Sequence, residues 1–172
     1  MENSYSIVYR LLVEDYQVND TGKVLARSLH PIQSDLDIRH VLAGVNRSPR
    51  NAILCCRDAQ GTLHVVDGHH GWASSCLLNK EVQINIIDCE DVDLLISDLN
   101  SSQECEGSKQ IKPELDINNP SNDLQVLFKQ YGQGLEGMEQ ELLKQVGNLP
   151  KPLANGGKGI PKSGMPQCDY LR

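Results

Sequence analysis

Two different hydrophobic periodicities meet at a single glycine in the middle of this chain. Before Gly68, residues 63–67 (LHVVD) form a short apolar run that is typical of a strand. After it, apolar residues recur at helical spacing through about Asn79, and they are Trp72, Ala73, Cys76 and Leu77. The sequence therefore predicts a strand that ends at Asp67 and a helix that starts near His70. Gly68 suits the turn because a residue without a Cβ lets the backbone bend there.

The segments before this turn predict a strand and a helix. Residues 6–13 (SIVYRLLV) have strand composition, and residues 14–23 supply acids and a turn. A helix is expected over residues 35–43, because apolar residues recur at helical spacing and two aspartates lie in its first turn. Ser34 is the expected N-cap, and Gly44 lies near the end of this helix.

The segments around and after the turn complete an α+β unit. Residues 51–56 (NAILCC) and 63–67 are expected to pair as antiparallel strands, because the Asp and Gly between them suit a hairpin connection. Residues 82–88 (VQINIID) alternate and predict a strand, and residues 90–100 predict a short helix. The fold class is therefore α+β, with one domain over residues 5–98.

The C-terminal part of the chain has a different composition. Residues 99–120 are polar and turn-rich, which predicts a linker. Residues 121–149 predict a helical extension of one or two helices, interrupted by Gly132, Gly134 and Gly137. Residues 150–172 are rich in Pro, Gly and Lys, so we expect a flexible tail that is extended or disordered unless something binds it.

Composition limits the partners of the chain. Its 172 residues carry a formal net charge of -7 at pH 7. Nucleic-acid backbones are bound mainly through Lys and Arg, so this charge disfavours nucleic acid as a partner. No run approaches the roughly 20 apolar residues of a membrane span, so no membrane partner is expected. The helical extension is a candidate surface for a protein partner.

The cysteines bear on the compartment and on metal binding. The six cysteines include no CxxC pair and no Cys/His spacing typical of structural zinc, so free and mostly buried thiols are expected and no metal site is assigned. The N-terminus has no basic segment followed by an apolar stretch. A cytoplasmic location is the resulting expectation.

The turn at Gly68 has two chemical interpretations. The first turn of a helix directs backbone N–H groups at one point, which is a ready site for phosphate. His69 and His70 could add hydrogen bonds there or carry protons near neutral pH. In the alternative, Asp67 caps the helix, His69 bonds a neighbouring strand and His70 lies in solvent, with no ligand. The local pattern leaves both interpretations open.

Two segments resemble a known superfamily. Residues 64–88 (HVVDGHHGWASSCLLNKEVQINIID) resemble the signature segment of the ParB/sulfiredoxin superfamily, and LHPIQSDLDIRHV, with Pro31 and Gln33, resembles the Pro-x-Gln segment of the ParB-like nuclease family. The resemblance covers roughly residues 5–93. It implies a small mixed sheet with flanking helices. It also implies a pocket for a nucleotide or phosphorylated small molecule, with ATP or ADP and Mg²⁺ as the expected cofactors.

The resemblance also implies which residues would form the site. The implied catalytic residues are Glu14, Asp67, His69 and His70, where Glu14, or Asp15 beside it, is the general base because kinase-like relatives use an early Glu. The implied ligand-binding residues are Gln33, Arg50, Gly68, His69, His70 and Gly71.

The chain departs from the family pattern at two positions. ATP-using members have an Arg where this chain has Gly71, which removes a permanently charged donor from the phosphate site. A substitute could come from the arginines of residues 39–57, which are Arg39, Arg47, Arg50 and Arg57. His69 replaces the cysteine of the sulfiredoxins, which disfavours sulfiredoxin chemistry.

Three function classes remain open from the sequence. The first is a phosphate-handling enzyme, either a nucleotide-dependent phosphoryl transferase or a hydrolase of phosphodiesters such as a nuclease. The second is a protein-interaction module that has kept the fold and lost the chemistry, for which Gly71 is the main argument. The third is a DNA-binding partitioning or regulatory factor, which the acidity and the lack of a recognisable helix-turn-helix disfavour.

Overall fold

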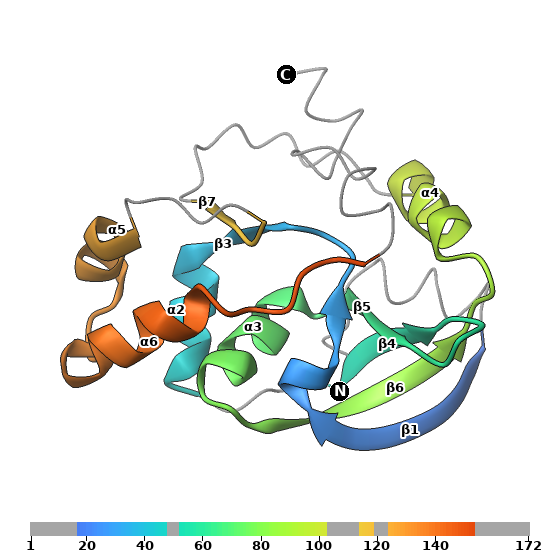
Figure 1. Cartoon of the computed structure of the whole chain (residues 1–172), viewed down its shortest axis with the longest axis horizontal. Helices are drawn as coiled ribbons and strands as arrows, with labels where there is room; N and C mark the ends of the chain where they lie inside the picture. Colours follow the sequence, from blue (N-terminus) through green and yellow to red (C-terminus); the bar gives the residue numbers. More distant parts are fainter. Residues whose placement is uncertain (1–16, 48–51, 103–113, 119–123, 154–172) are drawn as a thin grey trace, which may run out of the picture.

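The protein has an α+β architecture with a mixed sheet (Figure 1). The computed structural model describes residues 17–47, 52–102, 114–118 and 124–153, with side chains at 98–102 and 114 left undescribed. Within these residues it contains one five-stranded sheet, one two-stranded sheet and five α-helices. The predicted fold class is therefore confirmed at the level of a mixed α+β protein.

The five-stranded sheet is built around the predicted hairpin. Its order is β1 (Val18–Leu25), β6 (Glu81–Asp88), β4 (Ile53–Arg57), β5 (Leu63–Asp67) and β2 (His30–Pro31). β4 pairs antiparallel with β5 and parallel with β6, whereas β2 pairs parallel with β5 and β1 antiparallel with β6. The predicted hairpin and the predicted strand at residues 82–88 are confirmed.

Strand β1 corrects the sequence prediction for residues 14–23. The acids and turn residues of this segment predicted a turn, but from Val18 onward the chain is a strand that pairs with β6. Asn19, Asp20, Thr21 and Lys23 are all exposed, because β1 contacts the sheet along one edge only. Polar residues are tolerated at such a position, and the strand is specified by its partner more than by its own composition. The predicted strand at residues 6–13 lies outside the described residues.

Helix α2 (Ile38–Val45) begins three residues later than predicted, because residues 35–37 form a strand instead. This strand, β3 (Asp35–Asp37), pairs antiparallel with β7 (Glu114–Asp116). The N-cap is Asp37, whose side chain accepts a hydrogen bond from the backbone N–H of Arg39, and the predicted cap at Ser34 is wrong. β7 lies within the predicted linker, so that segment contributes a strand.

The remaining helices lie close to their predicted positions. Helix α3 (His69–Leu77) follows the turn at Gly68, and α4 (Val92–Ser102) follows β6. Helices α5 (Leu124–Tyr131) and α6 (Glu139–Val146) form the helical part of the predicted extension. Two short 3-10 turns occur at Ala26–Ser28 and Glu136–Met138.

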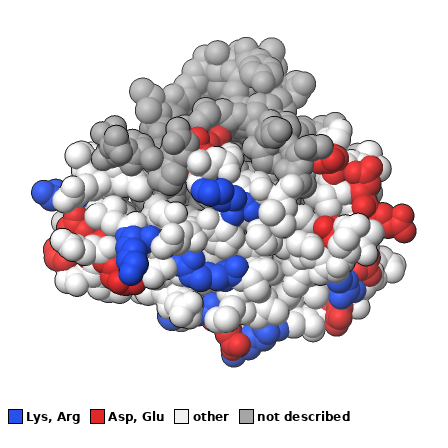
Figure 2. Space-filling model, in the orientation of Figure 1, with Lys and Arg blue, Asp and Glu red and all other residues white. Residues whose placement is uncertain are grey.

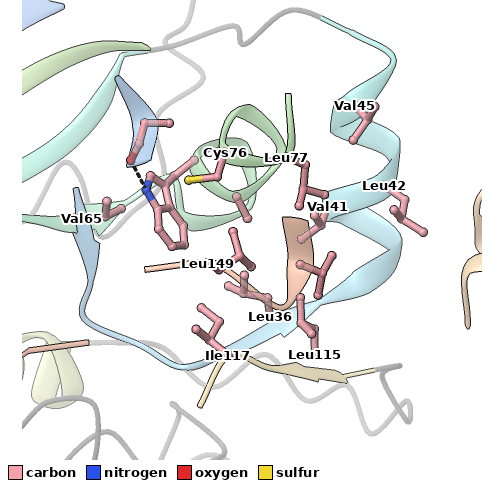
Figure 3. Packing of buried hydrophobic residues seen from close by; sticks show 14 of the residues in the cluster. Leu36, Val41, Leu42, Val45, Val65, Cys76, Leu77, Leu115, Ile117 and Leu149 are labelled. Atoms are coloured by element: carbon pink, nitrogen blue, oxygen red, sulfur yellow. Dashed lines mark hydrogen bonds between the residues drawn. The ribbon is translucent and has the colours of Figure 1, made fainter. Parts of the chain in front are cut away.

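A hydrophobic core surrounds α3 and joins the sheet to the C-terminal helices. Trp72 is fully buried at its centre, and its indole N–H donates to the carbonyl of Ala26 at 2.8 Å. Figure 3 shows how the residues of α2, α3, β3 and β7 meet there. Residues of α5, α6 and their flanks belong to the same core, namely Leu124, Phe128, Leu135, Leu142, Val146 and Leu149. Residues 124–149 therefore contribute to the same packed core as α3.

A smaller cluster lies on the other face of the sheet, where α4 contributes Val92, Leu95 and Ile96. Four cysteines are described, and all are buried free thiols, as predicted: Cys55, Cys56, Cys76 and Cys89. Cys105 and Cys168 lie outside the described residues. Burial raises the pKa of the Cys55 and Cys76 thiols to about 12, so these thiols stay protonated.

The first residues of the predicted tail lie against the domain. The Lys151 ammonium group donates to the carbonyl of Ile117 at 3.0 Å, and the Lys151 carbonyl lies 3.0 Å from Nδ1 of His30. Lys151 therefore connects the start of the predicted tail with His30 of β2 and with Ile117, which follows β7. The rest of the tail lies outside the described residues.

Charged groups of both signs are spread over the face in Figure 2. Acidic side chains are most numerous on the side of α4, and Lys and Arg groups lie mainly across the middle. No helix in the described part of the chain is both long and apolar enough to cross a membrane.

Helices α2 and α3 are in close contact at Gly44, which gives a stability prediction. A Cβ added at Gly44 would collide with Oγ of Ser74 and lie 3.0 Å from its Cβ. The Ser74 hydroxyl is itself held by the carbonyl of Val41 at 2.6 Å, so it cannot move aside freely. Gly44→Ala should therefore lower the free energy of unfolding by about 1–3 kcal/mol, measured by urea denaturation.

Gly71→Ala is the matched control, because Gly71 is also helical but a Cβ there meets no atom within 4 Å. This variant should be up to ~1 kcal/mol more stable than the wild type, since Ala favours a helix over Gly. Equal effects of the two substitutions would contradict the close helix approach at Gly44.

Candidate functional site

The predicted strand-to-helix turn is present and is formed by Gly68. Strand β5 ends at Asp67, and Gly68 adopts the left-handed conformation with φ of 99°. The carbonyl of Gly68 accepts the first helical hydrogen bond from the N–H of Trp72 at 2.9 Å. Gly68 is the N-cap and has no side chain to accept a hydrogen bond from the first turn of α3. The first-turn N–H groups are therefore not capped by the N-cap side chain.

His69 is buried and holds two parts of the backbone together. Its Nε2 accepts a hydrogen bond from the N–H of Ile32 at 3.2 Å, and the ring also hydrogen-bonds the backbone of Val65. Burial, with a smaller contribution from His70, lowers the pKa of His69 to about 3, against the opposing effect of the Val65 bond. His69 is therefore neutral at physiological pH, which disagrees with the expectation that it carries protons there. It bonds the segment after a neighbouring strand, as the alternative interpretation proposed.

His70 makes the second bond of the same kind. Its Nε2 accepts a hydrogen bond from the N–H of Asp37 at 3.0 Å. The ring is partly exposed, and its centroid lies 5.3 Å from that of His40 in an edge-to-face arrangement. His70 is thus neither a solvent side chain nor a buried one, and it connects α3 with the start of α2.

The two histidines bring the Pro-x-Gln segment to the start of α3. They bind its backbone at Ile32 and at Asp37, and the N–H of Ile117 binds the same segment at the carbonyl of Ser34, at 2.8 Å. The amide nitrogen of Gln33 donates to the carbonyl of Asp35 at 2.8 Å, so Gln33 stabilises its own loop. The structure therefore brings together the two segments from which the site was predicted.

Asp37 and Arg39 form an ion pair beside His70. The Asp37 side chain is only 6% exposed and accepts from Arg39 through Nε at 3.0 Å and Nη2 at 2.7 Å. Burial would raise the pKa of Asp37, but the hydrogen bonds from Arg39 and the charges of His40 and Arg39 together lower it below its usual value. Asp37 is therefore ionised at neutral pH. Sequence reasoning missed it as a site residue, although Asp at i and Arg at i+2 across a helix start is a local signal for such a pair.

Only one of the candidate arginines lies in this part of the described structure. Arg39 is at the N-terminal end of α2, whereas Arg47 follows its C-terminal end. Arg57 pairs with Asp88 at 2.8 Å, at the ends of β4 and β6. Arg50 lies outside the described residues, as do Glu14 and Asp15. Among the candidate arginines that the structure describes, Arg39 is therefore the one that could replace the guanidinium missing at position 71.

The N-termini of α2 and α3 lie side by side. His40 contacts His70 and Gly44 contacts Ser74, so the two helices run in the same direction. Parallel helices place the positive ends of both dipoles at the same end, where an anion is favoured. Open space surrounds the Cα of Gly71 in the first turn of α3. Among the described residues, no three His, Cys, Asp or Glu side chains converge as a metal site.

No protein-family model, curated protein or solved structure matches this chain. The resemblance of residues 64–88 to the ParB/sulfiredoxin superfamily therefore depends on the sequence motif alone.

The buried state of His69 gives a prediction for the pH dependence of stability. The unfolded chain takes up a proton near pH 6.5, whereas folded His69 takes it up only near pH 3. The contribution of His69 to the free energy of unfolding is thus fully present above pH 6.5 and is lost as the pH falls toward 3. Between pH 7.5 and 5.5 the free energy of unfolding should fall by about 1.4 kcal/mol more in the wild type than in His69→Gln.

Urea denaturation of both proteins at the two pH values measures this difference. Gln is the suitable replacement because its amide oxygen can still accept a hydrogen bond but does not titrate. The same pH dependence in both proteins would show that His69 takes up its proton equally in the folded and unfolded chains.

Proposed function

We propose that this chain is a phosphate-handling protein of the ParB/sulfiredoxin-like type. In this proposal the N-terminus of α3 binds the phosphate of a nucleotide or of a phosphorylated small molecule. The observation that carries the proposal is the open space at Gly71 in the first turn of α3. The preceding residue, His70, is hydrogen-bonded to Asp37, which forms the ion pair with Arg39.

Elementary electrostatics supports a phosphate at this position. The N–H groups in the first turn of a helix have no intrahelical acceptors, and the helix dipole adds a partial positive charge. Gly68 and Gly71 carry no side chains that would obstruct an approaching ligand there. The starts of α2 and α3 also carry His40, whose side chain is 62% exposed, and the partly exposed His70. The exposed His40 ring can donate a hydrogen bond to a phosphate oxygen.

The proposed reaction class is phosphoryl transfer or phosphodiester hydrolysis. Such reactions depend mainly on positioning and on stabilisation of phosphate charge. A bound ATP or ADP with Mg²⁺ would supply the phosphoryl group and the metal, with the metal held chiefly by the phosphates. Within the chain, His69 fixes the shape of the site, His70 and Gly71 border the ligand, and Asp67 provides a carboxylate at the turn. Glu14 remains the general base implied by the resemblance.

A second candidate is the protein-interaction module. His69 and His70 both use Nε2 to accept backbone N–H groups, so their presence is explained without any ligand. Together with Gly71 in place of the family arginine, this observation favours a chain that retains the fold for binding another protein.

Substitution of Gly71 distinguishes these two functions. Gly71→Arg should tighten ADP binding at least about tenfold relative to Gly71→Ala, because a charge-assisted hydrogen bond to phosphate contributes roughly 1.5–3 kcal/mol. Gly71→Ala is the matched control, since both variants gain helix propensity and neither Cβ meets an atom within 4 Å. The measurement is isothermal titration calorimetry with ADP and Mg²⁺ on the wild type and both variants.

One result would contradict the phosphate proposal, and a second would change where the ligand lies. Absence of ADP binding in all three proteins would contradict a nucleotide site and favour the interaction module. Weaker binding in Gly71→Arg than in Gly71→Ala would mean that the space at Gly71 is occupied by another part of the ligand.

A further inference from the structure

A short stretch of chain after α6 lies across the Pro-x-Gln segment. We call this stretch, residues 148–151, the C-terminal strap. In Figure 1 the chain that follows α6 crosses the connection from β2 to β3. The strap begins just after α6, where Nη1 of Arg27 donates to the carbonyl of Asn148 at 2.9 Å. It therefore joins the C-terminal helices to the part of the chain that leads into α2.

Lys151 attaches the strap at two places. Its ammonium group donates to the carbonyl of Ile117 at 3.0 Å, and its own carbonyl accepts from Nδ1 of His30 at 3.0 Å. Ile117 in turn donates through its backbone N–H to the carbonyl of Ser34 at 2.8 Å. Lys151 is therefore bonded directly to the start of the Pro-x-Gln segment and, through Ile117, to its middle.

Leu149 anchors the strap in the hydrophobic core. It is only 3% exposed and belongs to the cluster that contains Leu36 and Ile117. Figure 3 shows Leu149 near Leu36, which lies in β3 within the Pro-x-Gln segment. Beyond Lys151 the chain is less enclosed, since Leu153 is 60% exposed. Lys151 therefore supplies the last polar attachments of the strap within the described part of the chain.

The Pro-x-Gln segment is thus held by two separate parts of the molecule. Its N–H groups at Ile32 and Asp37 bind the two adjacent histidines of α3. Its bonds at His30 and Ser34 lead to the strap. The two sets of bonds alternate along the segment, so the position that one set gives the segment also affects the other set. Connected hydrogen bonds of this kind can couple separate parts of a protein.

We infer that the strap is a clamp, which controls how firmly the Pro-x-Gln segment is held on the start of α3. While Lys151 is bound, both sets of bonds fix the segment. When Lys151 detaches, the histidine bonds remain but open more often, because a segment with fewer contacts opens locally at a lower cost in free energy. Changes in the C-terminal helices are thereby transmitted to the turn at Gly68. The inference goes beyond the proposed function and does not depend on a phosphate ligand.

The test is amide hydrogen exchange, measured by NMR on the full chain without ligand. Lys151→Met keeps an apolar stem but removes the ammonium donor. The amides of Ile32 and Asp37 should then exchange about tenfold faster than in the wild type, as expected for the loss of one charge-assisted hydrogen bond. The amide of Trp72, which forms the first helical bond of α3, should be unchanged. Lys144→Met is the matched control, because Lys144 is a partly exposed lysine of α6 outside the strap, and it should leave all three amides unchanged.

A second variant separates the two attachments of Lys151. His30→Leu removes the bond to the Lys151 carbonyl and leaves the bond from the Lys151 ammonium group to Ile117. It should accelerate exchange at Ile32, which is close to His30 in the chain. Exchange at Asp37 should stay at the wild-type rate, because the bond between Ile117 and Ser34 is retained.

Each outcome supports or overturns the clamp. Faster exchange confined to the Pro-x-Gln segment in Lys151→Met, with no change in Lys144→Met, would support it. Unchanged exchange at Ile32 and Asp37 would overturn it, because the strap would then not act on the histidine bonds. Equal acceleration at Trp72 would also overturn it, since the substitution would then have destabilised the whole domain. If Lys151→Met does not fold, acceleration at Ile32 in His30→Leu supports the clamp and its absence overturns it.

Discussion

The arrangement of this protein depends on two adjacent imidazoles that accept hydrogen bonds from backbone N–H groups. His69 and His70 bind the segment of residues 30–37 at Ile32 and at Asp37. A buried N–H without an acceptor is costly, so these two bonds fix how this segment lies on the start of α3. Both rings must be unprotonated at Nε2 to accept, which links this part of the fold to the protonation state of histidine.

The position of the segment determines what the first turn of α3 meets. Because Asp37 ends the segment and caps α2, the histidine bonds also set where α2 begins. The close approach of Gly44 to Ser74 then keeps α2 and α3 parallel and side by side. His40 consequently lies next to His70, although thirty residues separate them along the chain.

Burial and hydrogen bonding therefore differ between neighbouring residues at one turn. His69 is buried and neutral, and its contribution is to stability and shape. Gly71 and His70 are partly exposed, and a Cβ at Gly71 would meet no atom within 4 Å. A family motif read along the sequence assigns one role to all of them, whereas burial differs sharply from one residue to the next. Site residues in such a motif are best distinguished by the bonds that each ring or carboxylate already makes.

The sequence alone determined the elements whose signals are local. The hairpin of β4 and β5, the turn at Gly68, helix α3 and strand β6 all follow from periodicity and turn chemistry, which depend on residues close together in the chain. Tertiary structure decided β1 and the pairing of β3 with β7, because each of these depends on a partner distant in sequence. It also decided how Asp37 is held against α3, because the backbone N–H of Asp37 binds His70. It also decided the roles of His69, Asp37 and Arg39. An imidazole next to glycine has the same local pattern whether it binds a phosphate or a backbone N–H, and only the residues that fold against it determine which.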